Sequence, residues 1–458
     1  MMKNRIYKVL VGIVLLTLVS CEKDFLEVKP NKALLVPTTL SDFEALLNNN
    51  SIMNRANYLS IIGSDDLSVT DAAFNNASFT LKNAYNWNEA IYEGEQPNEW
   101  LFPYYKVFYS NIVLDGLEKL EDKESSTYKN IKGSALFFRA FAFYELINSF
   151  TVAYQKATAL SELGIPLKLT SDVNEKYSRG NLQQSYDQVI RDLKVAIALL
   201  PNIAPNSYRP NNAAATALLS RIYLSMGEYN LALEEATNSL AINDKLINYN
   251  TLTLNPSSST VPFPKILPSN LNPEVLFNSG MIVSFINAAT TTVNPEIVNS
   301  YAVNDLRKAA FLYDRGGGVL TFKGRYSSST VTFSGLAVDE VLLTRAECYA
   351  RLNKPSEALA DLNLLLANRF KTGTFQPYIQ SGIPNVLNLI LTERRKELLF
   401  RGTRWMDLKR LNLDPERAVT LTRVLNGITY TLLPNSKRYV LPIPDDEILI
   451  SGIEQNTR

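Results

Sequence analysis

The sequence predicts a mainly α-helical fold, in which helix pairs of the tetratricopeptide type stack into an α-α superhelix with long loop-rich insertions. Three segments have the pattern of the second helix of such a pair, at residues 185–197, 227–240 and 353–362. Each has a matching first helix earlier in the chain, at residues 135–147, 213–226 and 338–352. One pair cannot bury its apolar face alone, so we expect neighbouring pairs to stack.

The three first helices share a small residue that is followed three positions later by an aromatic one. These residues are Ala140 and Phe143, Ser220 and Tyr223, and Ala346 and Tyr349. A small side chain lets the partner helix approach closely, which is typical of this repeat. Cys348 lies in the third of these helices, and we expect it to be buried as a small hydrophobic residue.

The N-terminus has the pattern of an export signal. Three basic residues within the first eight precede the apolar run Val9–Ser20, which is shorter than the roughly 20 residues that span a bilayer. We therefore interpret residues 1–20 as a signal peptide. Cys21 follows the small residue Ser20, as in a lipobox, and is the predicted site of lipid attachment. The alternative is an ordinary signal peptide followed by a chance cysteine.

The remaining residues, 21–458, are expected to form one domain. Residues 40–48 have the pattern of a helix. Residues 67–86 are rich in Asn, Ser and Thr, which predicts an exposed loop. Residues 87–121 place apolar and aromatic side chains near a 3.6-residue period, which predicts a helix.

Two insertions interrupt the helix pairs. Residues 151–181 separate the two helices of the first pair, with a turn expected at residues 164–167. Residues 244–336 are rich in Ser, Thr, Asn and Pro, and the prolines argue against long helices there. Long loops in a folded protein are usually functional. A helical scaffold that carries such loops indicates binding more often than catalysis.

The stretch from Leu391 to Leu411 is dense in arginine and lysine, which at first suggests a nucleic-acid surface. Its apolar residues, however, recur at helical spacing on both sides of Gly402. We interpret it as a packed helix–turn–helix element whose arginines form internal ion pairs. The formal net charge of the whole chain is +1, so no strong field attracts nucleic acid, and we expect no nucleic-acid partner.

The composition restricts the possible chemistry. The chain has no histidine, which excludes histidine acid–base catalysis and histidine metal ligation. Its two cysteines, Cys21 and Cys348, cannot form a disulfide framework or a cysteine-cluster metal site. Asp65 and Asp66 are adjacent carboxylates, but a turn or capping position explains them better than acid–base catalysis. We therefore predict no catalytic residue, no metal site and no cofactor.

Several motifs, taken in order, resemble the SusD/RagB family of Bacteroidetes outer-membrane lipoproteins over nearly the whole chain. They are the lipobox Cys21, Asp24-Phe25-Leu26, Gly63-Ser64-Asp65-Asp66, Arg139-Ala140-Phe141, Gly164-Ile165-Pro166-Leu167, Arg345-Ala346-Glu347, Glu393-Arg394-Arg395-Lys396-Glu397-Leu398, Gly402, Arg404-Trp405 and Tyr439-Val440-Leu441-Pro442-Ile443-Pro444. Members of the family commonly have an acidic residue before the signature glycine and a histidine after it. Here Arg401 and Thr403 occupy those positions, which puts the local ion pairing in question.

The resemblance implies a lipid-anchored binding protein on the outer face of the outer membrane. Such a protein captures oligosaccharides, or in some members peptides, and delivers them to a TonB-dependent transporter of the SusC type. No catalysis is implied. Two alternatives from other classes are a surface polysaccharide-degrading enzyme and a repeat scaffold that binds only protein.

Binding of a sugar requires flat aromatic faces together with amides, carboxylates or arginines that bind hydroxyls. Two regions offer such side chains, and within them we predict as ligand-binding residues Phe74, Asn75, Tyr85, Trp87, Arg315, Phe322 and Tyr326. Asn76 and Phe79 are further polar and aromatic residues of the first region. The alternative for each aromatic ring is simple packing, and Trp87, Trp100 and Trp405 in particular are expected to belong to the core.

The lipid anchor can be tested by mass. We expect protein that is expressed with its own signal peptide to begin at Cys21 and to carry added acyl mass on that residue, because lipobox processing frees the amine of Cys21 and modifies its thiol. Intact-mass spectrometry of the detergent-extracted protein measures both. An unmodified Cys21 would contradict the anchor.

Overall fold

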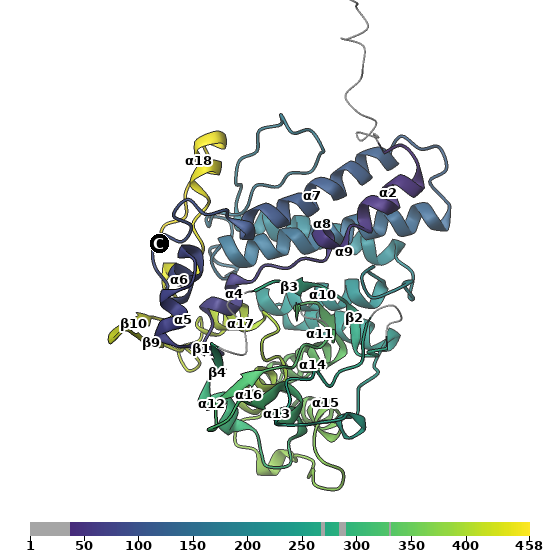
Figure 1. The fold of residues 1–458 in the computed structure, drawn as a ribbon. Helices are drawn as coiled ribbons and strands as arrows, with labels where there is room; N and C mark the ends of the chain where they lie inside the picture. Colours follow the sequence, from purple (N-terminus) through teal and green to yellow (C-terminus); the bar gives the residue numbers. More distant parts are fainter. Residues whose placement is uncertain (1–36, 267–270, 284–289, 329–330) are drawn as a thin grey trace, which may run out of the picture. The chain divides into compact units, whose positions relative to one another are not determined.

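The computed structural model describes residues 37–266, 271–283, 290–328 and 331–458, and residues 40–458 form one unit. The predicted signal peptide and Cys21 lie outside the described residues. The fold is mainly helical, as predicted (Figure 1). Its main helices are α7 (Asn98–Leu117), α8 (Ser126–Phe150), α9 (Leu182–Leu199), α10 (Asn212–Met226), α11 (Tyr229–Ile242), α14 (Val338–Arg351) and α15 (Pro355–Ala367).

The three predicted helix pairs are confirmed. Helix α8 packs against α9, α10 against α11 and α14 against α15, and α11 in turn packs against α14. The close approach depends on small residues: Ala213 to Ala215 of α10 are fully buried, and the hydroxyl of Ser239 on α11 donates to the carbonyl of Ala213 at 2.8 Å. Cys348 is buried in α14, as expected.

The prediction of an exposed loop at residues 67–86 was wrong. This segment contains strand β1 (Leu67–Val69) and the short helices α5 (Asp71–Asn75) and α6 (Phe79–Tyr85). The residues that suggested a loop are helix caps: the side chains of Thr70 and Ser78 accept hydrogen bonds from backbone N–H groups in the first turns of α5 and α6. The segment follows three short helices in the sequence, α2 (Leu40–Leu47), α3 (Asn50–Met53) and α4 (Leu59–Gly63).

The second insertion forms short strands and helices. Its helices α12 (Pro295–Ser300) and α13 (Leu306–Phe311) have six residues each, in agreement with the expectation of no long helices. Its strands are β2 (Val275–Phe277), β3 (Gly280–Met281), β4 (Thr291–Val293), β5 (Leu312–Asp314), β6 (Leu320–Phe322), β7 (Thr332–Phe333) and β8 (Leu336–Ala337). Within the insertion, β2 pairs with β8, β3 with β7 and β5 with β6, all antiparallel. Strand β4 pairs antiparallel with β1, which lies outside the insertion.

The basic stretch is the predicted helix–turn–helix. It contains α16 (Val386–Glu397) and α17 (Arg404–Leu411), which are joined by a turn with positive φ at Phe400 and Gly402. Its arginines form internal ion pairs: Arg394 with Asp407, Arg395 and Arg404 with Asp65, Arg401 with Asp339, and Arg410 with Glu347. Asp65 thus serves as an ion-pair partner beyond the turn role expected of it, and Arg401 retains a carboxylate partner although it departs from the family signature.

A fully buried charge network lies beside this element. Arg369 contacts Glu397 at 2.7 Å and Glu274 at 3.0 Å. Arg307 contacts Asp305 and Glu393, each at 2.6 Å, and also reaches Glu397. Both guanidinium groups are fully excluded from solvent. Since an unpaired buried charge is very costly, these contacts fix α13 and α16 relative to one another.

The C-terminal part contains a hairpin that the sequence analysis did not predict. Strands β9 (Leu421–Leu425) and β10 (Ile428–Leu432) pair through a turn at Asn426-Gly427, where both residues have positive φ. Helix α18 (Asp445–Ser451) is the last element of the described chain. In the part of the chain that the structure describes, none of the helices has the length and apolar character needed to span a membrane.

The buried network predicts a large effect of a single charge removal. We expect Glu397→Gln to lower the free energy of unfolding by roughly 3–5 kcal/mol, because it leaves Arg369 and Arg307 buried with fewer carboxylate partners. Urea denaturation followed by circular dichroism measures the change. The matched control is Glu118→Gln, which removes an exposed carboxylate paired with Lys123 and Lys132 and should cost no more than about 1 kcal/mol. Equal losses in the two variants would contradict the prediction.

Candidate functional site

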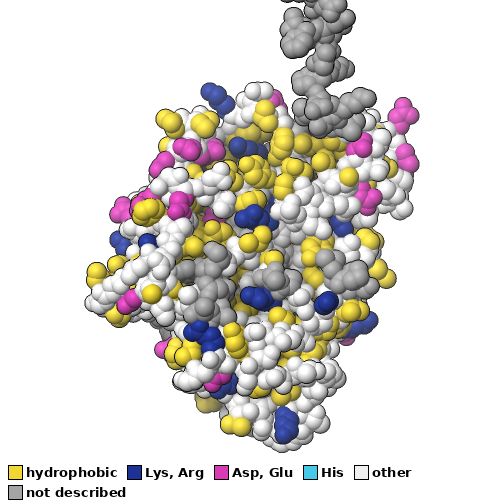
Figure 2. All heavy atoms as spheres, viewed as in Figure 1, with side chains coloured by type: hydrophobic (Ala, Val, Ile, Leu, Met, Phe, Trp, Pro, Cys, Tyr) yellow, Lys and Arg dark blue, Asp and Glu magenta, His cyan; other side chains and the backbone are white. Residues whose placement is uncertain are grey.

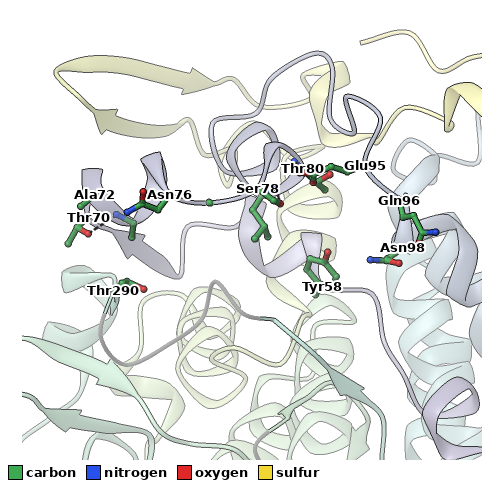
Figure 3. A pocket seen from close by; sticks show the side chains of 13 residues that line it. Tyr58, Thr70, Ala72, Asn76, Ser78, Thr80, Glu95, Gln96, Asn98 and Thr290 are labelled. Carbon is green, nitrogen blue, oxygen red and sulfur yellow. Dashed lines mark hydrogen bonds between the residues drawn. The ribbon is translucent and has the colours of Figure 1, made fainter.

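An open cavity of about 570 Å³ lies among α5, α6 and the start of α7 (Figure 3). Most of the side chains that line it are polar, namely Tyr58, Thr70, Asn76, Ser78, Thr80, Glu95, Gln96, Asn98 and Thr290. Its apolar contacts come mainly from alanines of α5 and from Leu81. We call this cavity the pocket. Eight of its thirteen lining residues lie between Thr70 and Leu81, in the first of the two regions in which the sequence analysis expected a ligand site, and Thr290 belongs to the second.

The residues that begin the local helices also form the wall of the pocket. The Thr70 hydroxyl accepts from the amide of Ala73 at 3.2 Å, and the Ser78 hydroxyl accepts from that of Leu81 at 3.4 Å. The Glu95 carboxylate accepts from the amides of Phe79 and Thr80, at 3.0 and 3.1 Å. These contacts satisfy backbone donors that a helix end leaves free, and they fix the side chains that face the cavity.

Glu95 is the acidic group of the pocket. Partial burial opposes its ionisation, but hydrogen bonds from Thr80, Phe79 and Ser78 outweigh that effect and lower the pKa of the carboxyl. Glu95 is therefore ionised at neutral pH. No lysine or arginine is among the described residues that line the pocket. The pocket thus offers one negative charge together with amides and hydroxyls, a set that suits a neutral, hydroxyl-rich ligand better than an anion.

Tyr58 is held in the wall by a buried carboxylate. One oxygen of Glu99 accepts from the amides of Tyr58 and Leu59, at 3.0 and 3.3 Å, at the start of α4. Burial, with a smaller contribution from Glu99, raises the pKa of Tyr58 to about 12. Its hydroxyl therefore remains protonated and available as a donor.

One exposed aromatic ring is next to two lining residues in the sequence. Phe79, the first residue of α6, lies between the lining residues Ser78 and Thr80 and has 56% of its surface exposed. Lys82 lies over its ring, 5.9 Å from the centroid. An exposed flat ring beside polar groups is what stacking against a sugar requires.

Three of the predicted ligand residues are not at the surface. Tyr85 and Trp87 are each only 2% exposed, and the guanidinium of Arg423 lies between them, 3.7 and 4.4 Å from the two ring centroids. The Tyr326 ring is also buried, its hydroxyl donates to Glu274, and Arg401 lies over it at 3.9 Å. We correct these three assignments, because rings enclosed by protein have no face left for a ligand. Trp87, Trp100 and Trp405 are core residues, as expected.

The other four predicted residues do not gather at one place. Phe74 is buried as well, with its ring 6.2 Å from that of Tyr85, so we correct this assignment for the same reason. Asn75 is exposed and exchanges side-chain hydrogen bonds with Asn426 of the hairpin. Arg315 is exposed at the tip of β5–β6, while Phe322 stacks on Phe400 with ring centroids 4.5 Å apart. None of the four lines the pocket.

Three lining residues lie where the sequence analysis expected a helix. Glu95, Gln96 and Asn98 fall within the predicted helix 87–121, but α7 begins only at Asn98. Gly94, with φ of +82°, and Pro97 interrupt the helical pattern. Greater weight on this glycine and proline would have revealed the non-helical segment. Among the described residues, no cluster of acidic and cysteine side chains could hold a metal ion.

Comparison with known proteins places the chain beside one family. Residues 24–224 match a family described as starch-binding and associating with the outer membrane, and residues 338–457 match the SusD family. SusD-like protein P2 of Formosa agariphila is 24% identical, with 97% of each chain covered. SusD-like protein P38 of the same organism is 37% identical over 20% of this chain.

Solved structures share the fold. A SusD superfamily protein from Bacteroides thetaiotaomicron superposes with a TM-score of 0.73 at 22% identity, covering 92% of this chain and all of that one. A SusD-like carbohydrate binding protein from Bacteroides vulgatus superposes with a TM-score of 0.66 at 20% identity, covering 91% of this chain and 97% of the other.

The buried carboxyl behind Tyr58 predicts a pH dependence. Burial, partly opposed by the amides of Tyr58 and Leu59, raises the pKa of Glu99 to about 7. The folded protein therefore holds a proton that the unfolded chain releases near its ordinary pKa of about 4.5, so stability should fall as pH rises from about 5 to 8.

We expect Glu99→Gln, which cannot ionise, to show a flatter dependence of the free energy of unfolding over this range. Urea denaturation at several pH values measures both slopes. Glu95→Gln is the control for a carboxyl whose pKa is lowered, and it should leave the slope above pH 5 unchanged. Parallel curves for the wild type and Glu99→Gln would refute the assignment.

Proposed function

This chain belongs to the SusD/RagB family, and from that membership and the geometry of the pocket we propose that it is a cell-surface protein that binds oligosaccharides. The pocket carries the proposal, because its amides, hydroxyls and single carboxylate match the hydroxyl groups of a neutral sugar. The exposed ring of Phe79, which neighbours two lining residues in the sequence, adds an aromatic face for stacking. The proposed ligand is an oligosaccharide rather than a peptide because the described lining has few apolar side chains to receive those of a peptide.

The proposed location is the outer membrane, with the protein held by lipid on Cys21 and facing the cell exterior. The matching family is described as associating with that membrane, which supports this part of the proposal. The bound sugar would then pass to a SusC-like TonB-dependent transporter. Co-purification of a large barrel protein with this chain in detergent would support the partnership, and its absence from a pull-down under those conditions would count against it.

Binding and catalysis are separated by one assay. We expect retardation of the protein in native gels that contain one of five neutral polysaccharides, namely amylopectin, xylan, laminarin, mannan or galactan, with no release of reducing ends from that polysaccharide. Release of reducing ends would show an enzyme. Failure of all five gels, together with failure of a calorimetric screen of their oligosaccharides, would refute sugar binding.

The pocket itself is tested by Gln96→Ala. Gln96 is an exposed lining residue, and loss of its amide should weaken retardation by about three- to tenfold, because each hydrogen bond contributes roughly 0.5–1.5 kcal/mol. Gln155→Ala, which removes an exposed glutamine outside the pocket, is the matched control and should bind as the wild type does. Equal binding by the two variants would place the sugar elsewhere.

A further inference from the structure

Helix α7 carries a row of aromatic rings on its outward face. Asn98, Phe102, Tyr105 and Tyr109 follow one another at spacings of four, three and four residues, which places them on one side of the helix. Tyr105 has 46% and the neighbouring Phe108 36% of its surface exposed. Hydrophobic side chains are visible over α7 in the space-filling view (Figure 2). We call the face formed by residues 102, 105, 108 and 109 the α7 aromatic row.

Packing within the protein accounts for only part of this face: Tyr109 is half-buried against the hydrophobic core, whereas Tyr105 and Phe108 are exposed. Phe102 and Tyr105 meet edge to face with centroids 6.0 Å apart, and Phe108 and Tyr109 do so at 6.5 Å. The hydroxyl of Tyr105 makes no hydrogen bond with any described residue. Helix residues that support the core, such as Trp100 and Val107, point the other way and are buried. The rings of Tyr105 and Phe108 are therefore available to a molecule outside the fold.

An unpaired arginine lies where the row meets the pocket. The guanidinium of Arg55 lies 3.5 Å from the centroid of the Phe102 ring and, within the described residues, forms no side-chain hydrogen bond and no ion pair. Partial burial lowers its pKa, but the group remains charged. Its five N–H donors lie near Tyr58, a residue of the pocket wall. Donors without acceptors beside the half-buried Phe102 ring indicate a ligand that carries oxygen atoms.

We propose that the α7 aromatic row continues the pocket, and that the ligand is an extended glycan chain which runs from the pocket over this row. The inference rests on the proposed function. Asn98 connects the two, since it lines the pocket and begins the row. Sugar C–H faces stack on the rings, while Arg55 donates to hydroxyls at the junction. From Asn98 to Tyr109 the helix rises roughly 16 Å, so the row holds several sugar units.

The test compares three substitutions at Tyr105 in the polysaccharide gels. Tyr105→Phe keeps the flat ring and should bind as the wild type does. Tyr105→Ala and Tyr105→Leu remove the ring, and we expect each to weaken retardation about fivefold, the effect of one lost aromatic stack. Leu449→Ala, at an exposed apolar side chain of α18, controls for loss of surface hydrophobicity and should have no effect. Circular dichroism confirms that each variant is folded.

The outcomes separate this inference from the proposed function. Normal retardation of Tyr105→Ala, with loss in Gln96→Ala, would overturn the row and leave sugar binding in the pocket intact. Retardation of Tyr105→Leu equal to that of the wild type would show that the flat ring is not needed, and would also overturn the inference. Failure of the wild type in all five gels and in the oligosaccharide screen would overturn the proposed function, and this inference with it.

Discussion

The buried ionic network around Arg307 and Arg369 is the constraint on which much of the structure depends. Both guanidinium groups are completely removed from water, so each needs carboxylates in fixed positions. Those carboxylates come from distant parts of the chain: Glu274 from the second insertion, and Glu393 and Glu397 from α16. Charge pairing therefore joins an insertion of little regular structure to the helix pairs. Such pairs define one arrangement more sharply than apolar contact does, because a displaced partner leaves a charge without compensation.

The helix–turn–helix of α16 and α17 extends the same principle towards the pocket. Arg404 holds both carboxylate oxygens of Asp65, at 2.7 and 2.9 Å, in the turn that follows α4. Arg423 of the hairpin donates to the carbonyls of Ile62 and Tyr85, at the ends of α4 and α6. The C-terminal segment thus positions the N-terminal elements that surround the pocket. The basic stretch, which resembles a nucleic-acid surface in the sequence, therefore uses its arginines to hold elements of the protein together.

The sequence predicts this fold well where periodicity is strong. The helix pairs from α8 to α15 have small and aromatic residues at regular spacing, and their existence and pairing were confirmed. It predicts the site poorly, for a physical reason. Thr70, Ser78 and Asn76 belong to a composition that favours loops, although two of them cap helices. Tyr85 and Tyr326 were attractive as exposed rings, and only the tertiary structure shows that Arg423 and Arg401 cover them. Aromatic residues in irregular segments serve packing and binding alike, and local sequence does not distinguish the two.

The double use of capping residues in the pocket bears on how this protein could evolve. Thr70, Ser78 and Glu95 face the cavity while they hold the first turns of α5 and α6. A substitution there would change recognition and loosen the wall at once, so selection has little freedom at these positions. Gln96 is exposed and its side chain caps no helix, so under the proposed function it is a position where the ligand could change without a loss of architecture. Related proteins should accordingly diverge slowly at the three capping residues and more rapidly at Gln96.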